Sequence, residues 1–370
     1  METNMEMNTE VQVETSAQEH TEVMDAYEPG AIEKGAAILK DGGVVAFPTE
    51  TVYGLGALAT SRTAVQKIFE AKGRPADNPL IVHIADMTML KELIEGDIPL
   101  DASLLAEEFW PGPLSMIFKK SKKVPDSVTA GLETVAVRMP SNPAALMLIK
   151  EAGPIAAPSA NRSGRPSPTS AKHVLDDMDG RIPLILDSGS CRVGLESTVL
   201  DLTCTPPRVL RPGGVTPTQI AEVIDEVEVD GSVLRPLQEG EIARSPGMKY
   251  RHYAPEGSVT IVKGARKRAA SKICRLYDEA KAQGKKPAIL ASSSNRTLYG
   301  DRTVRMLGSG VAEQSRELFA ALREMDDIKA DAVFCEALDA KELGLAYMNR
   351  LGRAASFNVI DADKREEHRK

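Results

Sequence analysis

The chain of 370 residues is long enough for two or three domains, and its 42% hydrophobic and 27% charged residues are typical of a globular protein. This composition excludes disorder throughout, a collagen-like fibre and a disulfide-stapled miniprotein. The net charge of −7 arises in residues 1–30, which hold eight Asp and Glu and no Lys or Arg. The remaining 46 basic and 45 acidic residues nearly cancel, so charge alone neither supports nor excludes a local phosphate site.

Residues 1–30 are polar and acidic without periodicity, and we expect them to form a disordered tail. From Ala31, short β-branched runs alternate with helical patterns, which predicts a mixed α/β domain over residues 31–235. Its predicted strands are Val44–Phe47, Leu80–Ile84, Leu114–Phe118, Val135–Val137, Ile155–Ala157, Leu184–Leu186, Thr198–Leu202 and Val209–Leu210. Its clearest predicted helices lie between Ser61 and Gly73, after Asn142-Pro143, and from Thr169 or Ser170 to Gly180.

Residues 236–257 lack periodicity and are too long for an ordinary connection, so we interpret them as a linker or lid. Residues 258–360 predict a smaller, Rossmann-like α/β domain, and residues 361–370 a charged tail. The predicted strands of the smaller domain are Val259–Val262, Ala288–Leu290, Val304–Leu307 and Ala332–Cys335, and its predicted helices are Ala265–Ala282, Val311–Met325 and Leu345–Ala355.

The four cysteines, Cys191, Cys204, Cys274 and Cys335, form neither a CxxC pair nor a zinc-binding spacing. We expect reduced thiols in a cytoplasmic protein. No apolar run approaches the roughly 18 residues of a membrane span, and the acidic N-terminus is unlike a secretory signal, so we expect no contact with a membrane.

The familiar nucleotide-binding motifs are missing. The sequence contains no GxxxxGK[ST] phosphate loop. Gly54, Gly56 and Ala59 match G-x-G-x-x-[G/A], but six residues separate them from the strand ending at Phe47, whereas a dinucleotide fingerprint lies at the strand-to-helix turn. We therefore interpret this stretch as a glycine loop that turns the chain. This weak match is the only support for a third hypothesis, that the protein is a nicotinamide-dependent oxidoreductase.

The segment Ala157–Val174, APSANRSGRPSPTSAKHV, is rich in hydroxyls and cations and contains no acid. Such groups just before a helix N-terminus favour an anion site, because backbone N–H groups and the helix dipole reinforce the side-chain donors. The alternative is a Ser/Pro linker. A predicted strand enters the segment and a predicted helix leaves it, which places it inside a domain and favours the anion site.

Several other basic residues stand where ligands could bind. Arg138 and Arg211 each close a predicted strand, the position where ligands collect in α/β sheets, although a lone arginine there is more often a salt-bridge partner. Lys72 and Arg74 follow a helix end, where they could simply complement the helix dipole. His83 lies within the apolar run LIVHI, which favours a hydrogen-bonded core histidine.

Together these residues predict a pocket that is rich in cations and hydroxyls and poor in acids. Such a pocket suits phosphates and carboxylates, and it lacks the Asp and Glu cluster of an all-protein magnesium site. Spacing supports no Ser/His/Asp or Cys/His catalytic arrangement. The residues alone therefore indicate an α/β enzyme that handles phosphates and carboxylates.

Seven motifs occur in a fixed order: PTETVYGLG (Pro48–Gly56), KGR (Lys72–Arg74), NPLIVH (Asn78–His83), PSANRSGRPSPT (Pro158–Thr169), EST (Glu196–Thr198), LRPG (Leu210–Gly213) and SPGMKYRHYAP (Ser245–Pro255). Each is weak alone, but in this order, and with LGLAYMNRLGRAAS near the end, they are highly specific. From about Ala31 to Ile360 the chain resembles the two-domain threonylcarbamoyl-AMP synthases of the YrdC/YwlC family.

The resemblance implies a fold and a reaction. The fold is an α/β twisted open mixed sheet with a large, positively charged cavity, followed by the smaller domain. The reaction is the nucleotidyl transfer that joins L-threonine, bicarbonate or CO₂, and ATP into L-threonylcarbamoyladenylate with release of pyrophosphate. The product feeds the t⁶A modification at adenosine 37 of tRNA, through a separate threonylcarbamoyltransferase complex.

The resemblance also assigns side chains to the two substrates. The threonine side comprises Thr51, His83, Arg138, Ser159 and Ser197. The ATP side comprises Arg74, Asn78, Thr134, Asn161, Thr169 and Arg211, with Lys72 as an additional cation. Lys72, Arg74 and Arg138 are the expected catalytic residues. We expect no metal ligand from protein side chains, and Mg²⁺ held mainly by the ATP phosphates.

The SPGMKYRHYAP segment places Tyr250, Arg251, His252 and Tyr253 between two prolines, whereas a mere tether would use Gly, Ser or charged residues. Its aromatic and cationic middle can contact an anionic nucleotide, so we expect a lid over the cavity. The alternative is an ordered strap that only fixes the orientation of the domains.

The main alternative function is a non-catalytic RNA-binding protein of the same fold, because a basic concave face also suits phosphodiester backbones; weak RNA binding could equally accompany the synthase. The nearly neutral body and the 4% aromatic content argue against base stacking as the main activity.

Overall fold

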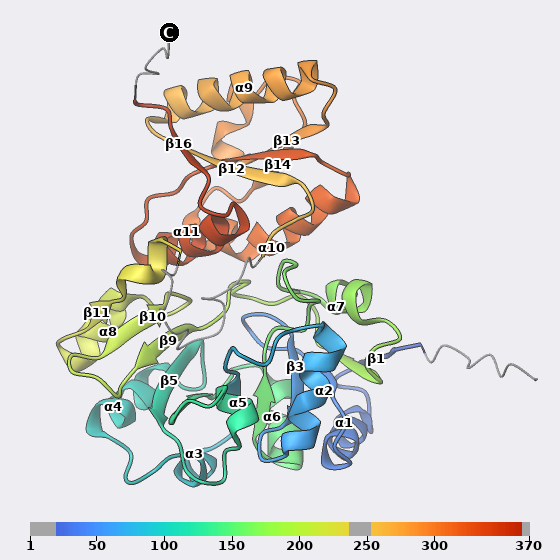
Figure 1. Ribbon diagram of the computed structural model, residues 1–370, viewed down its shortest axis with the longest axis vertical. Helices are drawn as coiled ribbons and strands as arrows, with labels where there is room; N and C mark the ends of the chain where they lie inside the picture. Colours follow the sequence, from blue (N-terminus) through green and yellow to red (C-terminus); the bar gives the residue numbers. More distant parts are fainter. Residues whose placement is uncertain (1–19, 237–252, 365–370) are drawn as a thin grey trace, which may run out of the picture.

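The computed structural model describes residues 20–236 and 253–364, which form two domains stacked along the long axis of the molecule (Figure 1). The first domain contains strands β1 to β11, and the second contains β12 to β16. Within these two ranges, no helix is both long enough and apolar enough to cross a membrane.

The first domain is built on a mixed sheet of eleven strands in the order β1-β8-β2-β3-β7-β4-β6-β5-β9-β10-β11. The strands are β1 (Glu22–Asp25), β2 (Val45–Phe47), β3 (Gly54–Leu58), β4 (Ile81–His83), β5 (Leu114–Lys119), β6 (Thr134–Arg138), β7 (Ile155–Ala157), β8 (Leu184–Asp187), β9 (Thr198–Asp201), β10 (Arg208–Arg211) and β11 (Glu228–Val229). The eight strands that the apolar runs predict are β2 and β4 to β10. The mixed α/β class is therefore confirmed.

Helices pack on both faces of this sheet because consecutive side chains of a strand point to opposite faces. Val45 and Phe47 of β2 join the apolar core under α1 and α6, whereas Ala46 joins the core under α2, α4, α7 and α8. The helices are α1 (Ala31–Lys40), α2 (Arg62–Lys72), α3 (Met87–Leu93), α4 (Leu100–Phe109), α5 (Asp126–Thr129), α6 (Pro143–Ala152), α7 (Ala171–Met178) and α8 (Pro217–Ile224), followed by the 3₁₀ turn η1 (Gly231–Leu234).

The predicted helix ends near the site are confirmed by their capping contacts. The Ser61 hydroxyl accepts a hydrogen bond from the Ala64 N–H at 3.2 Å, and Gly73 ends α2 in the left-handed conformation. The Asn142 side chain caps α6, with Pro143 in its first turn, and Ser170 caps α7. These caps determine where the loops that follow β3, β6 and β7 begin and end.

Gly54 and Gly56 lie inside strand β3, so the interpretation of this stretch as a glycine loop is wrong. A Cβ atom on Gly56 would lie 2.6 Å from Ile155 Cγ2 and 2.9 Å from Phe47 Cε1. The glycines allow β3 to pack closely against the side chains of its two neighbouring strands. Two of the five residues of β3 are glycines, so the strand carries little of the β-branched pattern that indicated the other strands.

The acidic N-terminal segment is also more ordered than expected. Strand β1 pairs in parallel with β8, and the Thr21 hydroxyl donates to the Met178 and Ile182 carbonyls at 3.0 and 2.7 Å. The expectation of a disordered tail is therefore wrong for residues 20–30, while residues 1–19 lie outside the described range. Most of β1 is exposed, and backbone hydrogen bonds hold it at the edge of the sheet. Such a strand does not need an apolar pattern, so the sequence did not indicate it.

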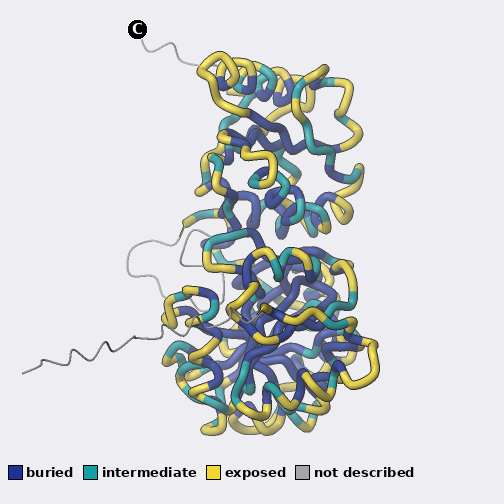
Figure 2. Tube along the Cα trace, turned by 90° about the vertical axis from the view of Figure 1, so that its right-hand side faces the viewer, coloured by how far each residue is buried: buried dark blue, intermediate teal, exposed yellow. Residues whose placement is uncertain are grey.

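The second domain is a parallel five-stranded sheet in the order β14-β13-β15-β12-β16. Its helix α9 covers one face, and α10 and α11 cover the face toward the first domain (Figure 1). The elements are β12 (Ser258–Lys263), α9 (Arg266–Ala282), β13 (Pro287–Ser292), the 3₁₀ helix η2 (Ser293–Leu298), β14 (Val304–Leu307), α10 (Val311–Asp327), β15 (Ala332–Glu336), α11 (Glu342–Ala354) and β16 (Val359–Asp361). Figure 2 shows buried residues concentrated in the interior of both domains and where the domains meet.

The predicted charged tail begins later than expected. Asp361 ends β16, and the Asp363 carboxylate accepts hydrogen bonds from the Ala265 N–H at 3.1 Å and pairs with Arg268. Residues 365–370 lie outside the described range. The predicted strands and helices of the second domain are otherwise confirmed, with β16 added at the edge.

The close packing of β3 can be tested with Gly56→Ala. We expect the unfolding free energy in urea to fall by about 1–3 kcal/mol, because the added methyl overlaps Ile155 and Phe47. Gly231→Ala is a matched control, since a Cβ there meets nothing within 4 Å, and its effect should stay within about 0.5 kcal/mol. Equal stability of the two variants would contradict the packing argument.

Candidate active site

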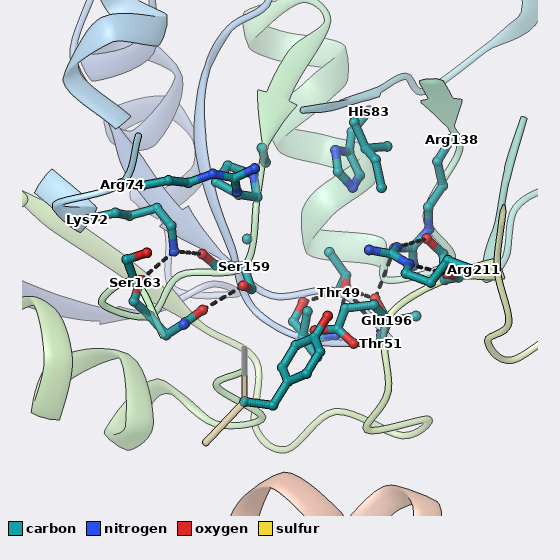
Figure 3. A pocket seen from close by; sticks show the side chains of 18 of the residues that line it. Thr49, Thr51, Lys72, Arg74, His83, Arg138, Ser159, Ser163, Glu196 and Arg211 are labelled. Carbon is teal, nitrogen blue, oxygen red and sulfur yellow. Dashed lines mark hydrogen bonds between the residues drawn. The ribbon is translucent and has the colours of Figure 1, made fainter. Parts of the chain in front are cut away.

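One cavity of the first domain gathers most of the cations that the sequence singles out. Lys72 and Arg74 lie on one side, and Arg138 and Arg211 lie on the other (Figure 3). The predicted residues that line it are Thr51, Lys72, Arg74, His83, Arg138, Ser159, Asn161, Ser197, Arg211 and Tyr253. They come from the ends of β4, β6 and β10, from the end of α2 and the residues just after it, from the loops beside β3, β7 and β9, and from the residues before β12.

Arg138 ends β6 and is held in place from three sides. Its guanidinium donates to the Thr51 hydroxyl at 2.9 Å and to the Gly112 carbonyl at 3.1 Å, and forms an ion pair with Glu50 at 2.6 Å. Both charged side chains are 4% exposed. A buried ion pair with additional hydrogen bonds fixes the direction of the guanidinium, so Arg138 is a preorganised anion-binding group.

Arg211 ends β10 and is connected to Ser197. Its Nε donates to the Ser197 carbonyl and its Nη2 to the Ser197 hydroxyl, both at 3.1 Å, and that hydroxyl lies 2.8 Å from the Ser115 hydroxyl. Burial and the nearby Arg350 charge lower the pKa of Arg211 to about 10. Arg211 is therefore still a cation at neutral pH.

Lys72 crosses from the end of α2 to the loop after β7. Its Nζ donates to the Ser159 carbonyl at 2.6 Å and to the Asn161 carbonyl. The Ser159 hydroxyl in turn donates to Asn161 Oδ1 at 2.5 Å. Burial and the neighbouring Arg74 lower the pKa of Lys72 well below its usual range. Lys72 is a positioned amine that both orders this loop and faces the cavity.

The sequence predicted His83 as a core histidine, and the family resemblance predicted it as a contact to threonine. The side chain is buried and also lines the cavity, so its position is compatible with both predictions. Its ring packs edge-on against Phe47, with the ring centroids 5.7 Å apart. Its Nδ1 has no hydrogen-bond partner among the described residues. Burial, together with the Arg138 charge, lowers the pKa of His83 to about 3. A neutral imidazole with an unused ring nitrogen can accept or donate one hydrogen bond to a ligand.

Three predicted ATP contacts do not line the cavity. Asn78 is buried with both amide atoms unpaired in the described structure, while its carbonyl accepts from Arg74 Nη2 at 3.0 Å. Thr134 begins β6, four residues before Arg138, and Thr169 lies 3.3 Å from His173 Nδ1 through its hydroxyl. Their assignment to ATP stays a prediction.

The predicted lid falls largely outside the described residues. Tyr250, Arg251 and His252 lie in that undescribed range, so a lid role for them stays a prediction. Tyr253 is described and lines the cavity, with its ring 5.1 Å from that of Phe319 in the second domain. The last of the four predicted lid residues therefore reaches the site.

Sequence reasoning missed two groups of the cavity wall. The Thr49 hydroxyl lies 2.8 Å from that of Thr51 and donates to the Val52 carbonyl at 2.6 Å. Glu196 is the one acid among the described lining residues, and its Oε1 accepts from the Ser167 hydroxyl at 2.5 Å while its Oε2 pairs with Arg350. Its position in the EST motif, beside Ser197, was the available signal.

The described lining of the cavity offers few side chains of the kinds that bind metal ions. The described residues contain no group of three or more His, Cys, Asp or Glu side chains that could hold a metal ion. Both carboxylate oxygens of Glu196 are already engaged. That Mg²⁺ is held mainly by the ATP phosphates stays a prediction.

Comparison with protein families gives two matches. The Sua5/YciO/YrdC family model, described as telomere recombination, matches residues 37–213. A second model, described as the C-terminal domain of threonylcarbamoyl-AMP synthase, matches residues 215–356. Together the two matches span most of both domains.

Individual relatives are similar over nearly their whole length. A threonylcarbamoyl-AMP synthase of Pyrococcus abyssi is 49% identical over 91% of this chain and 98% of its own. That of Bacillus subtilis is 47% identical over 89% and 94%. The crystal structure of P. abyssi Sua5 complexed with L-threonine superposes with a TM-score of 0.88, at 48% identity, over 92% of this chain and 99% of that one.

The burial of His83 can be tested by pH. Its folded pKa of about 3 lies below its ordinary value of 6.5, so the stability it contributes is present above pH 6.5 and is lost as the pH falls toward 3. We expect the unfolding free energy of His83→Gln to fall less steeply than that of the wild type between pH 6 and 4, by roughly 1.4 kcal/mol per pH unit. Parallel stability curves from urea titrations would show that His83 is not buried in its neutral form.

Proposed function

The chain belongs to the Sua5 family of threonylcarbamoyl-AMP synthases, and we propose that it forms threonylcarbamoyl-AMP and pyrophosphate from L-threonine, ATP, and bicarbonate or CO₂. It is an enzyme that acts on threonine and ATP, a nucleotidyltransferase. The observation that carries the proposal is the convergence of Lys72, Arg74, Arg138 and Arg211 on one cavity. Four basic side chains around one cavity suit a reaction in which every substrate is anionic or becomes so.

We propose that the residues of the cavity divide between the two substrates. We propose that Arg138, with Thr51, His83, Ser159 and Ser197, holds the threonine carboxylate, amine and hydroxyl. Arg74, Lys72 and Arg211 then hold the triphosphate. Because arginine presents a planar fork with a permanent charge, it suits both carboxylate and phosphate oxygens. The buried contacts of Arg138 and Arg211 keep these forks in fixed directions before substrate arrives.

The chemistry needs positioned substrates more than a protein nucleophile. The threonine nitrogen attacks the carbon of CO₂, the new N–C bond gives a carbamate, and the amine proton is released. A carbamate oxygen then attacks the α-phosphorus in line, and the bond from that phosphorus to the bridging oxygen breaks as pyrophosphate leaves. Carboxylate, carbamate and triphosphate repel one another, so the cations must hold them together at reacting distance.

Mg²⁺, when bound, would neutralise charge on the pyrophosphate. We propose that it is carried mainly by the ATP phosphates, because Glu196 uses both of its oxygens within the protein.

The setting of the reaction is proposed on chemical grounds. The mixed anhydride product must pass to a transferase that moves the threonylcarbamoyl group onto adenosine 37 of tRNA. The four cysteines are free thiols, which supports a reducing compartment and hence the cytoplasm.

The alternative of a non-catalytic RNA-binding protein is less well supported. Lys72, Arg138 and Arg211 are each 5% exposed or less, and they point into a cavity rather than along an open face. A phosphodiester backbone needs cations that it can reach from outside. The described cavity instead suits small anions.

Pyrophosphate release tests the proposal directly. We expect release only when ATP, threonine and bicarbonate are all present, with serine a nearer competitor than valine, because a site built to bind a hydroxyl rejects an isostere that lacks it. The measurement is a coupled pyrophosphate assay in which each substrate is omitted in turn. ATP turnover that is unchanged without threonine would refute the synthase assignment.

The division of the cavity can be tested with Arg138→Ala and Arg211→Ala. We expect the first to weaken threonine binding and the second to weaken ATP binding, each by about 2–4 kcal/mol, or roughly 30- to 1000-fold. Calorimetric titration of both ligands into both variants measures the split. Arg→Lys controls should restore only part of the affinity, because a point charge cannot replace the fork. Identical losses for the two ligands would show the division to be wrong.

A further inference from the structure

A fully buried arginine of the second domain enters the wall of the cavity. Arg350 lies on α11 and is 0% exposed. Its Nε donates to Glu196 Oε2 at 2.7 Å, and its Nη2 donates to the Glu196 carbonyl at 3.3 Å. Its Nη1 donates to the Pro212 carbonyl at 2.9 Å and to Asn349 Oδ1 at 2.7 Å. All three nitrogens of the guanidinium are therefore engaged, and two of them reach the first domain only.

Each of the two segments that Arg350 connects has a cavity residue directly beside the residue that Arg350 contacts. Glu196 immediately precedes Ser197, and Pro212 immediately follows Arg211. The segments also touch each other, since a Cβ on Gly213 would lie 2.2 Å from the Thr198 backbone nitrogen. Moving either segment would therefore displace the Arg211–Ser197 contact, in which the two hydrogen bonds are 3.1 Å long.

The charges in this wall depend on one another. Burial alone would raise the pKa of Glu196, but the Arg350 and Arg211 guanidinium groups keep it below its usual range. Glu196 therefore stays ionised between the two arginines. The Arg350 guanidinium also lies 5.9 Å from the centre of the Tyr253 ring, which lines the cavity. A lysine would keep the charge of Arg350 but could not hold the carboxylate and both carbonyls together.

A second arginine of the second domain allows a comparison. Arg323 on α10 is 7% exposed and donates to Asp177 Oδ2 at 2.7 Å and to the Pro166 carbonyl at 2.6 Å. Neither Asp177 nor Pro166 is among the lining residues. The two arginines thus make the same kind of contact between the domains, but only the partners of Arg350 adjoin the substrate groups.

We propose that Arg350 is a positioning residue, through which the second domain sets Ser197 and Arg211 for the reaction. It acts through Glu196 and the Pro212 carbonyl rather than on substrate. The proposal depends on the synthase function proposed above. The second domain then completes the active site of the first, and the orientation of the two substrates relative to each other depends on the contact between domains.

The test compares Arg350→Lys with Arg323→Lys in the full chain. We expect both to lower the melting temperature to a similar extent. Arg350→Lys should lower kcat at least tenfold with the KM for ATP within threefold, because a misplaced pair of substrates reacts slowly even when bound. Arg323→Lys should stay within threefold of the wild type in kcat. Equal kcat for the two variants, measured where both are folded, would overturn the proposal.

A double-mutant cycle with Glu196→Gln tests the route. If Arg350 acts through Glu196, the tenfold cost of Arg350→Lys should fall below threefold in the Glu196→Gln background. The same cost in both backgrounds would refute this route. Should Arg350→Lys fail to fold, Glu196→Ala removes the side-chain acceptor of Arg350 Nε from the other side, and wild-type kcat in that variant would overturn the proposal. Absence of pyrophosphate release by the wild type would instead refute the synthase function itself.

Discussion

The structure depends on keeping several basic side chains buried around one cavity. Like charges in a dehydrated space repel, and an isolated buried charge costs several kcal/mol, so each must find compensation nearby. Glu50 supplies it for Arg138, and Glu196 supplies it for Arg211. Lys72 has backbone carbonyls instead, and its lowered pKa shows that they compensate only in part. The guanidinium groups of Arg138 and Arg211 that line the cavity suit anionic ligands.

The compensating contacts also determine how the surrounding loops run. Lys72 holds the loop after β7 by two carbonyls, and Arg138 links the end of β6 to the loop before β3. The side chains that hold these loops in place also face the cavity. The same residues therefore support the fold and are available to bind a ligand. Hydroxyls such as those of Thr51 and Ser197 are oriented by the cations and so can serve the substrate without further rearrangement.

The sequence predicted those parts of the fold that depend on burying apolar side chains. Central strands such as β4 and β6 and capped helices such as α2 were predicted from pattern alone. Strands β1 and β3 were not, because backbone pairing at an edge and close glycine packing leave no periodic signal. In the site, strand-end arginines were predicted correctly as cavity residues, whereas spacing could not reveal which of the matched polar residues, such as Thr134, stay away from the cavity.

The contact between the domains could not be predicted from the sequence either, because it joins residues that are far apart in the chain. Arg350 and Glu196 lie 154 positions apart, and neither is unusual by itself. Helix α11 nevertheless carries buried polar residues, Asn349, Arg350 and Arg353, in addition to its apolar ones. A helix that packs on one sheet exposes its opposite face, so burial of several polar side chains requires a second partner. That partner is the first domain, which satisfies the buried Arg350 guanidinium with the Glu196 carboxylate and the Glu196 and Pro212 carbonyls, next to Ser197 and Arg211.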